Sequence, residues 1–344
     1  TLLDQITRWA SKHRRSVCLS ILVGCIGFFG FAISTARFAA LRSDAEKQTA
    51  RAEQGRRLAH ETIDQFGSRV AELLADIPAA GGVRRELLRD TLVYYEQLAS
   101  STGNDPALRH TLAVTYGKIG SLHSQLNAIE EAIEALRTSE ALYAELAETA
   151  SDGAAAKLEW SISQNNLAQS LQQAGRLEDA GRVYAQAMKL QETLYAEEPD
   201  ENVGRKLATT LNNLALLLSE SGAEAMAEEY FMRAITLLQP NPESLPNAEQ
   251  AQQFAAVLAN LSGLLATQKP SAAVEFARQA LQYQSEALES NPADAKLATQ
   301  VVVTLNTLGK SLTHAGQTQA AIDALGRAID IGEQLVARGP NQPT

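Results

Sequence analysis

Leucines recur at a fixed interval through the second half of the chain, and each begins the same pattern of apolar and small positions. Leu167, Leu214, Leu261 and Leu308 stand 47 residues apart. The positions that follow each of them keep mostly to steps of three to five residues, which is the spacing of one face of a helix. A period of this length is typical of solenoids, in which every repeat is one pair of packed helices. The pattern therefore predicts an all-α solenoid of antiparallel helix pairs.

Three repeats carry this pattern without a gap. In the second unit the seven positions are Leu167, Ala168, Leu171, Gly175, Ala180, Tyr184 and Ala187, and the third and fifth units repeat them at identical offsets. The glycine predicts the turn between two helices, and the alanines predict their close approach. The fourth unit lacks one residue at its turn, where Lys269 and Pro270 stand. The first unit, read from Leu112 and Ala113, requires an insertion before Ala132.

These positions resemble the tetratricopeptide repeat, whose signature is a helix with Leu-Gly and tyrosine, a turn, and a second helix with alanine and phenylalanine. The resemblance covers residues 107–338, about five units, although the usual tryptophan at the head of each unit is missing. The family's unit has 34 residues, so both helices are longer here, as in the kinesin light chain type, which also shares the sequence Asn-Asn-Leu-Ala. The resemblance implies a right-handed solenoid whose first helices line a concave groove.

An apolar stretch near the start predicts a membrane anchor. Residues 17–34 contain no charge, and 18 residues of helix reach about 27 Å, enough for a thin bilayer core. We expect a transmembrane helix over 16–35, preceded by a basic segment over 1–15. The distribution of Lys and Arg favours a cytoplasmic N-terminus and an exported repeat domain. A signal peptide cleaved near Ser34 and Ala36 is the alternative.

Small residues within this stretch bear on oligomeric state. Ser20, Gly24, Gly27 and Ser34 fall near one helical face, and small side chains let two membrane helices approach closely. They are consistent with a homodimer through the membrane helix. The alternative is that glycine is simply common in such helices.

Two helical segments are expected between the apolar stretch and the repeats. Residues 36–58 have a seam of alanine and polar residues and are interpreted as a juxtamembrane stalk. Residues 59–106 are expected to form a divergent helical hairpin that caps the stack, with a break at Pro78, Gly81 and Gly82. Residues 339–344 form a tail.

Charge and composition exclude several classes of function. The chain has a net charge of −10, and the residues after position 58 hold 20 basic and 36 acidic side chains. Such a domain repels phosphates, so nucleic acid is not an expected partner. Both cysteines, Cys18 and Cys25, lie in the apolar stretch, so no cysteine-based metal site is expected in the repeats.

No catalytic or cofactor-binding constellation is evident. The five histidines are scattered, and none has the spacing of a metal site. Gly309-Lys310-Ser311 is similar to the end of a phosphate-binding loop, but Thr304 stands where such a loop needs a glycine, and the segment is predicted to lie inside a helix. We therefore expect a binding protein without a metal or cofactor, rather than an enzyme.

Asparagines on the first helices are the candidate binding residues. Each lies one or two positions before a marker leucine or its equivalent, and a carboxamide can donate and accept hydrogen bonds at once, which suits the backbone of an extended peptide. The candidate groove residues are Asn165, Asn166, Gln169, Asn212, Asn213, Asn260, Asn306 and Lys310. The expected ligand is a protein or peptide. The alternative is that these amides bond neighbouring helices to each other.

The order of segments resembles one further family. A basic segment, one membrane helix, an alanine-rich stalk and the sequence of residues 84–120 are similar to the region after the kinase domain in membrane-bound serine/threonine kinases of planctomycete-type bacteria. The resemblance implies that this chain is the anchor and docking array of such a receptor, with the catalytic domain before Thr1. The alternative is a free-standing exported repeat protein that assembles envelope complexes.

Overall fold

The computed structural model describes residues 81–102, 109–149, 153–239 and 248–338, all within one compact unit that spans Gly67–Thr344. Every secondary-structure element in this part of the chain is a helix. The segments predicted at 1–15, 16–35, 36–58 and 339–344 lie outside the described residues, as does the first helix of the predicted capping hairpin. None of the helices in the described part is long and apolar enough to span a membrane.

The helices have the following bounds: α3 Gly81–Thr102, α4 Arg109–Gln125, α5 Ile129–Thr149, α6 Gly153–Gln173, α7 Leu177–Glu197, α8 Glu201–Glu220, α9 Glu224–Leu238, α10 Ala248–Leu265, α11 Pro270–Ser290, α12 Ala295–His314 and α13 Thr318–Arg338.

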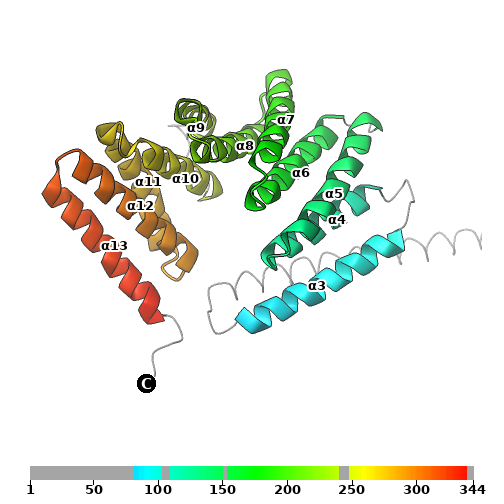
Figure 1. Ribbon diagram of the computed structural model, residues 1–344, viewed down its shortest axis with the longest axis horizontal. Coiled ribbons are helices and arrows are strands. Elements are labelled where there is room, and N and C mark those ends of the chain that lie inside the picture. Colours follow the sequence, from blue (N-terminus) through cyan, green and yellow to red (C-terminus); the bar gives the residue numbers. More distant parts are fainter. Residues whose placement is uncertain (1–80, 103–108, 150–152, 240–247, 339–344) are drawn as a thin grey trace, which may run out of the picture. The chain divides into compact units, whose positions relative to one another are not determined.

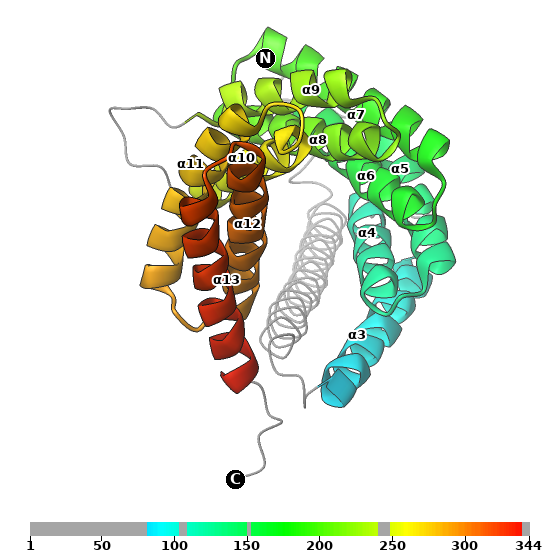
Figure 2. The same cartoon turned by 60° about the vertical axis from the view of Figure 1, so that its left-hand side comes forward.

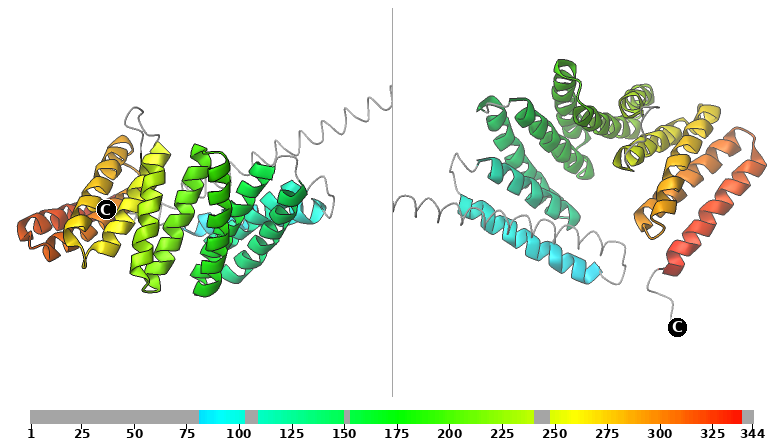
Figure 3. Two further views of the ribbon diagram at one scale, coloured as in Figure 1. Left: turned by 90° about the horizontal axis from the view of Figure 1, so that it is seen from above. Right: turned by 180° about the vertical axis from the view of Figure 1, so that it is seen from behind.

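Each helix packs against the next one along the chain (Figure 1). The repeats are the pairs α4–α5, α6–α7, α8–α9, α10–α11 and α12–α13, and Figure 2 shows α12 and α13 lying side by side. The first helices also contact one another from repeat to repeat, α6 with α8, α8 with α10, and α10 with α12. The views in Figure 3 show the same succession of pairs. First helices of neighbouring repeats are therefore close enough to build one shared surface.

The predicted marker positions form the core. Ala180, Ala227 and Ala273 are completely buried, which lets the two helices of a repeat cross closely. Tyr184 and Phe231 are 1% exposed and fill the space beside the following repeat. In the fourth unit the shortened turn places Ala277, rather than Phe276, at this position.

Glycines in the left-handed backbone conformation form the turns of three repeats. Gly175, Gly222 and Gly316 have φ values of 74°, 82° and 74°, a region that side chains with a Cβ disfavour. In each turn the backbone N–H that follows the glycine donates to a carbonyl five residues earlier, as Arg176 does to Leu171 at 2.9 Å. The predicted role of these glycines is confirmed.

The first unit corrects the register expected from the sequence. Asn127 has a φ of 61°, and the N–H of Ala128 donates to the carbonyl of His123 at 2.9 Å, so this turn is the equivalent of the one at Gly175. Ile119 and Gly120 are therefore the counterparts of Leu167 and Ala168, and no insertion precedes Ala132. Leu112 and Ala113 lie seven residues earlier, two turns along the same helical face, which is why they imitate the marker pair.

The last helix leaves one apolar face uncovered. Ile322, Leu325, Ile329 and Val336 of α13 are 39–76% exposed. The counterparts of Leu325 in earlier repeats are Tyr184 and Phe231, which the next repeat buries. The exposure of this face follows from its position at the end of the described helices.

Candidate functional site

Four asparagines on α6, α8 and α10 form one chain of hydrogen bonds. Asn213 Nδ2 donates to Asn165 Oδ1 at 3.3 Å, and Asn260 Nδ2 donates to Asn212 Oδ1 at 2.9 Å. Asn212 Nδ2 donates to Asn213 Oδ1 at 3.3 Å and joins the two pairs. We call Asn165, Asn212, Asn213 and Asn260 the asparagine ladder.

The repeat register positions the ladder. Leu167, Leu214 and Leu261 are at most 6% exposed and anchor their helices in the core. The one or two residues before each leucine then lie at the edge of that core, and all four ladder side chains are partly exposed. Each of the two bonds between helices joins an asparagine directly before a leucine to one that lies two before the leucine of the previous repeat. The bonds are thus diagonal, across 48 residues rather than 47.

The ladder ends at α10, because the next pair of positions lacks asparagine. On α12 the next rung is Thr307, whose hydroxyl donates to the carbonyl of Val303 in its own helix at 3.0 Å. The required partner on α10 is Ala259, which has no polar side chain. Because α10 and α12 pack together without such a bond, the contact between first helices does not depend on it.

The other predicted groove residues lie outside the ladder. Asn166, Asn306 and Lys310 are exposed and make no side-chain hydrogen bond with the described residues. The structure therefore brings together four of the eight candidates and shows that Asn165, rather than Asn166, forms the first rung.

A polar pocket adjoins the ladder at Asn213 and includes the remaining candidate, Gln169. It has a volume of about 340 Å³ and is lined by Gln169, Gln172, Gln173, Tyr184, Asn213, Leu216 and Glu220. We call it the ladder pocket. Gln172 Nε2 donates to Glu220 Oε2 at 2.9 Å and so ties α6 to α8.

Tyr184 gives the ladder pocket a hydroxyl that the sequence did not reveal. Its ring is a core marker, yet its OH lies 3.5 Å from Gln172 Oε1. Burial raises the pKa of Tyr184 above its usual range, and the charge of Glu220 adds to the rise. The hydroxyl is therefore protonated at neutral pH and is a hydrogen-bond donor.

The ladder has unused hydrogen-bonding capacity. Each ladder amide has two N–H groups and two lone pairs, and the ladder uses at most one of each. The remaining donors and acceptors are spread over three helices. Within the described residues no cluster of His, Cys, Asp or Glu could hold a metal ion.

Comparisons with known proteins identify the repeats. A family model described as tetratricopeptide repeat matches residues 161–200 and 207–239, and a second model of the same description matches 113–145. These segments coincide with the pairs α6–α7, α8–α9 and α4–α5. No curated protein has detectable sequence similarity to the chain.

Solved structures of repeat proteins are similar to this chain at low sequence identity. BtubC (BKLC) from P. vanneervenii is 21% identical with a TM-score of 0.57, and the match covers 75% of this chain and 95% of that one. A putative kinesin light chain protein of Podospora anserina with nearly identical TPR-like repeats is 19% identical, with a TM-score of 0.45 over 66% of this chain and 97% of that one. YrrB, described as a TPR protein with an unusual peptide-binding site, is 17% identical with a TM-score of 0.33 over 64% and 86%.

Proposed function

Because the chain is built from tetratricopeptide repeats, we propose that it is an interaction scaffold that binds an extended peptide segment across the asparagine ladder. The observation that carries this proposal is the chain of half-exposed amides across α6, α8 and α10. An extended peptide presents alternating N–H and C=O groups, and the unused donors and acceptors of the ladder match both kinds.

A purely structural role explains the ladder less well. A hydrogen bond between neutral, partly exposed groups contributes about 0.5–1.5 kcal/mol to stability, and two of the three bonds are 3.3 Å long. The contact between α10 and α12 forms with Ala259 and Thr307 in place of asparagines. The repeats therefore pack without the ladder, and its amides are available for a ligand.

The ladder pocket supports a side-chain preference. It opens beside Asn213 and contains the carboxamides of three glutamines, the Tyr184 hydroxyl and the Glu220 carboxylate. A polar side chain of the peptide that both donates and accepts hydrogen bonds is the best match for these groups.

Selection from a random peptide display library tests the proposal. We expect the full chain to enrich peptides that are lost when Asn212 and Asn213 are both replaced by alanine. Asn306→Ala, which changes an exposed amide outside the ladder, is the matched control and should retain them. Enrichment of the same peptides on the doubly substituted chain would contradict the proposal.

The second part of the proposal concerns the membrane anchor of the scaffold and the larger protein to which it belongs. The charge-free residues 17–34 and the basic residues before them support a single-pass membrane anchor with an extracytoplasmic repeat domain. We propose that the chain is the non-catalytic docking region of a receptor-type bacterial serine/threonine kinase, with the free-standing exported protein as the alternative. The reading frame before Thr1 decides between them: a kinase domain supports the first, and a start codon within a few residues contradicts it.

A further inference from the structure

A second pocket lies between α5 and α7, over α6, away from the residues assigned above. Its volume is about 390 Å³, and it is lined by Glu140 of α5, Trp160 and Gln164 of α6, and Gln186, Lys189, Leu190 and Thr193 of α7. We call it the tryptophan pocket. None of its residues belongs to the asparagine ladder or the ladder pocket.

Two side chains hold the Glu140 carboxylate in place. Trp160 Nε1 donates to Glu140 Oε1 at 2.6 Å, and Gln164 Nε2 donates to the same oxygen at 3.4 Å. The other carboxylate oxygen accepts no hydrogen bond from the described residues. The pocket thus contains the fixed negative charge of Glu140, with one free acceptor oxygen, beside the indole ring of Trp160.

Gln164 provides a second unused acceptor. Its side chain is 4% exposed, and its Oε1 has no hydrogen-bond partner within the described part of the chain. Because Nε2 is oriented by the Glu140 carboxylate, Oε1 cannot be exchanged for the donor end. A buried carbonyl without a partner is uncommon in proteins, and such a group is typically completed by water or a ligand.

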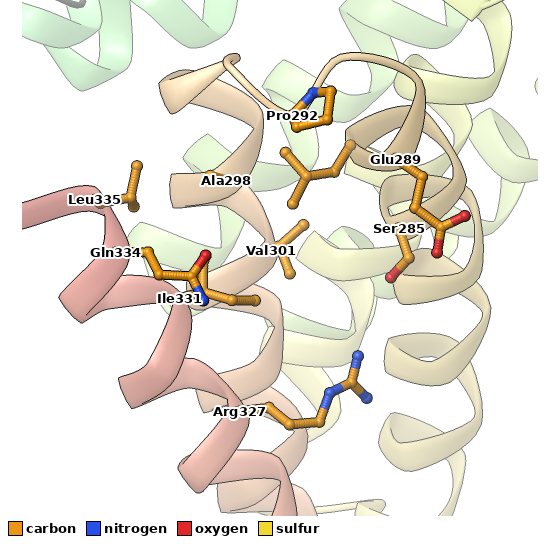
Figure 4. A pocket seen from close by; sticks show the side chains of 10 residues that line it. Ser285, Glu289, Pro292, Ala298, Val301, Arg327, Ile331, Gln334 and Leu335 are labelled. Carbon is orange, nitrogen blue, oxygen red and sulfur yellow. The ribbon is translucent and has the colours of Figure 1, made fainter. Parts of the chain in front are cut away.

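Two other pockets between second helices contain the chain's own arginine. Between α7 and α9, Arg233 Nη2 donates to Glu192 Oε1 of the preceding second helix, and both residues line the pocket there. Between α11 and α13, Arg327 lines a pocket together with Glu289 and Ser285 (Figure 4). Arg233 and Arg327 directly precede the marker alanines Ala234 and Ala328. The residue at this position in the tryptophan pocket is Gln186.

We propose that the tryptophan pocket binds the guanidinium group of an arginine side chain from a partner protein. Like the other two pockets, it has a glutamate from the preceding second helix, although at a different position of that helix, and it lacks the arginine that they supply themselves. A guanidinium is planar and always charged, donates to two acceptors at once, and stacks on aromatic rings. The free oxygen of Glu140 offers an acceptor and Trp160 offers the ring, and the Gln164 amide holds the Glu140 carboxylate in place. Lys189 is exposed and is the one basic residue that lines the pocket.

The proposal does not rest on peptide binding at the ladder. It concerns other side chains and another ligand, so each can fail without the other.

Fluorescence of Trp160 provides the readout. The chain has two tryptophans, and Trp9→Phe in the full chain leaves Trp160 as the only one. We expect saturable changes in its emission on titration with N-acetyl-arginine amide. N-acetyl-citrulline amide has the same shape without the charge and should bind at least about tenfold more weakly, because the charged hydrogen bonds are lost.

Three further substitutions in this background define the site. Glu140→Gln should weaken binding of the arginine probe at least about tenfold, whereas Glu148→Gln, an exposed glutamate of the same helix, should have no effect. Gln186→Arg should abolish binding, because it supplies the arginine found in the other pockets. Thermal unfolding followed by circular dichroism confirms that each variant is folded.

Three results would overturn the proposal. They are no saturable change with the arginine probe, equal affinity for arginine and citrulline, and unchanged affinity in the folded Gln186→Arg chain. If Glu140→Gln does not fold, Gln164→Leu takes its place with the same expected loss, because it removes one of the two donors that hold the Glu140 carboxylate.

Discussion

Asn213 is the central residue of the ladder, because its amide donates to Asn165 and its carbonyl accepts from Asn212. The two columns of asparagines are visible in the sequence as residues one and two positions before a leucine. Their diagonal pairing is not visible, because it depends on how far one first helix is shifted along the next. Asn166 lies outside the ladder for the same reason.

The turns require glycine because of their backbone conformation, and not because a side chain would lack room. A Cβ at Gly222 would meet no atom within 4 Å, but its φ is 82°. Gly222→Ala should therefore lower the free energy of unfolding by about 1–2 kcal/mol, the cost of a left-handed residue that has a Cβ. Denaturant unfolding measures this loss.

Gly263→Ala is the matched control. Gly263 also has open space around it but lies inside α10 without a positive φ. This substitution should raise stability by about 0.5–1 kcal/mol. Equal effects of the two substitutions would show that the turn geometry is wrong.

At the scale of the element, the helix pairs were largely predictable because the small residues at their crossings are spaced by the repeat. The register of the second, third and fifth units and the shortened turn of the fourth follow from the sequence. The sequence pattern predicts the wrong register for the first unit, because Leu112–Ala113 and Ile119–Gly120 lie two turns apart on one face of α4. The positive φ of Asn127 identifies the correct pair.

The crossing of α8 and α9 tests the helix pairing. Ala227 is completely buried there, so Ala227→Phe should overpack the repeat and cost about 1–3 kcal/mol. Ala225→Phe, at an exposed position of the same helix, should change stability little. An unchanged melting temperature for Ala227→Phe would contradict the pairing.

Alanine substitutions at corresponding positions of two second helices should lower the free energy of unfolding by different amounts. Leu281 of α11 is 6% exposed, whereas Ile329 of α13, its counterpart, is 60% exposed. Leu281→Ala should lose about 2–5 kcal/mol, and Ile329→Ala should lose well under half of that, since little burial is removed. Similar losses in chemical denaturation would mean that the face of α13 is covered in solution.

At the scale of the whole molecule, the lengthened repeats provide two kinds of surface. The first helices carry the asparagine ladder, and neighbouring second helices, with residues of the first helix between them, line the pockets between α5 and α7, α7 and α9, and α11 and α13. The ladder residues were found from the sequence because they sit beside a repeating marker. The tryptophan pocket was not, because Glu140, Trp160 and Gln164 come from two helices and show no period.

The most direct test of the central claim compares binding and stability in one variant, Asn213→Ala. For a peptide selected on the unchanged chain, the dissociation constant should rise at least about tenfold, because the substitution removes groups from the ladder and the ladder pocket. The free energy of unfolding should fall by no more than about 1 kcal/mol. An unchanged dissociation constant together with a large loss of stability would show that the ladder holds the helices together and does not bind the peptide.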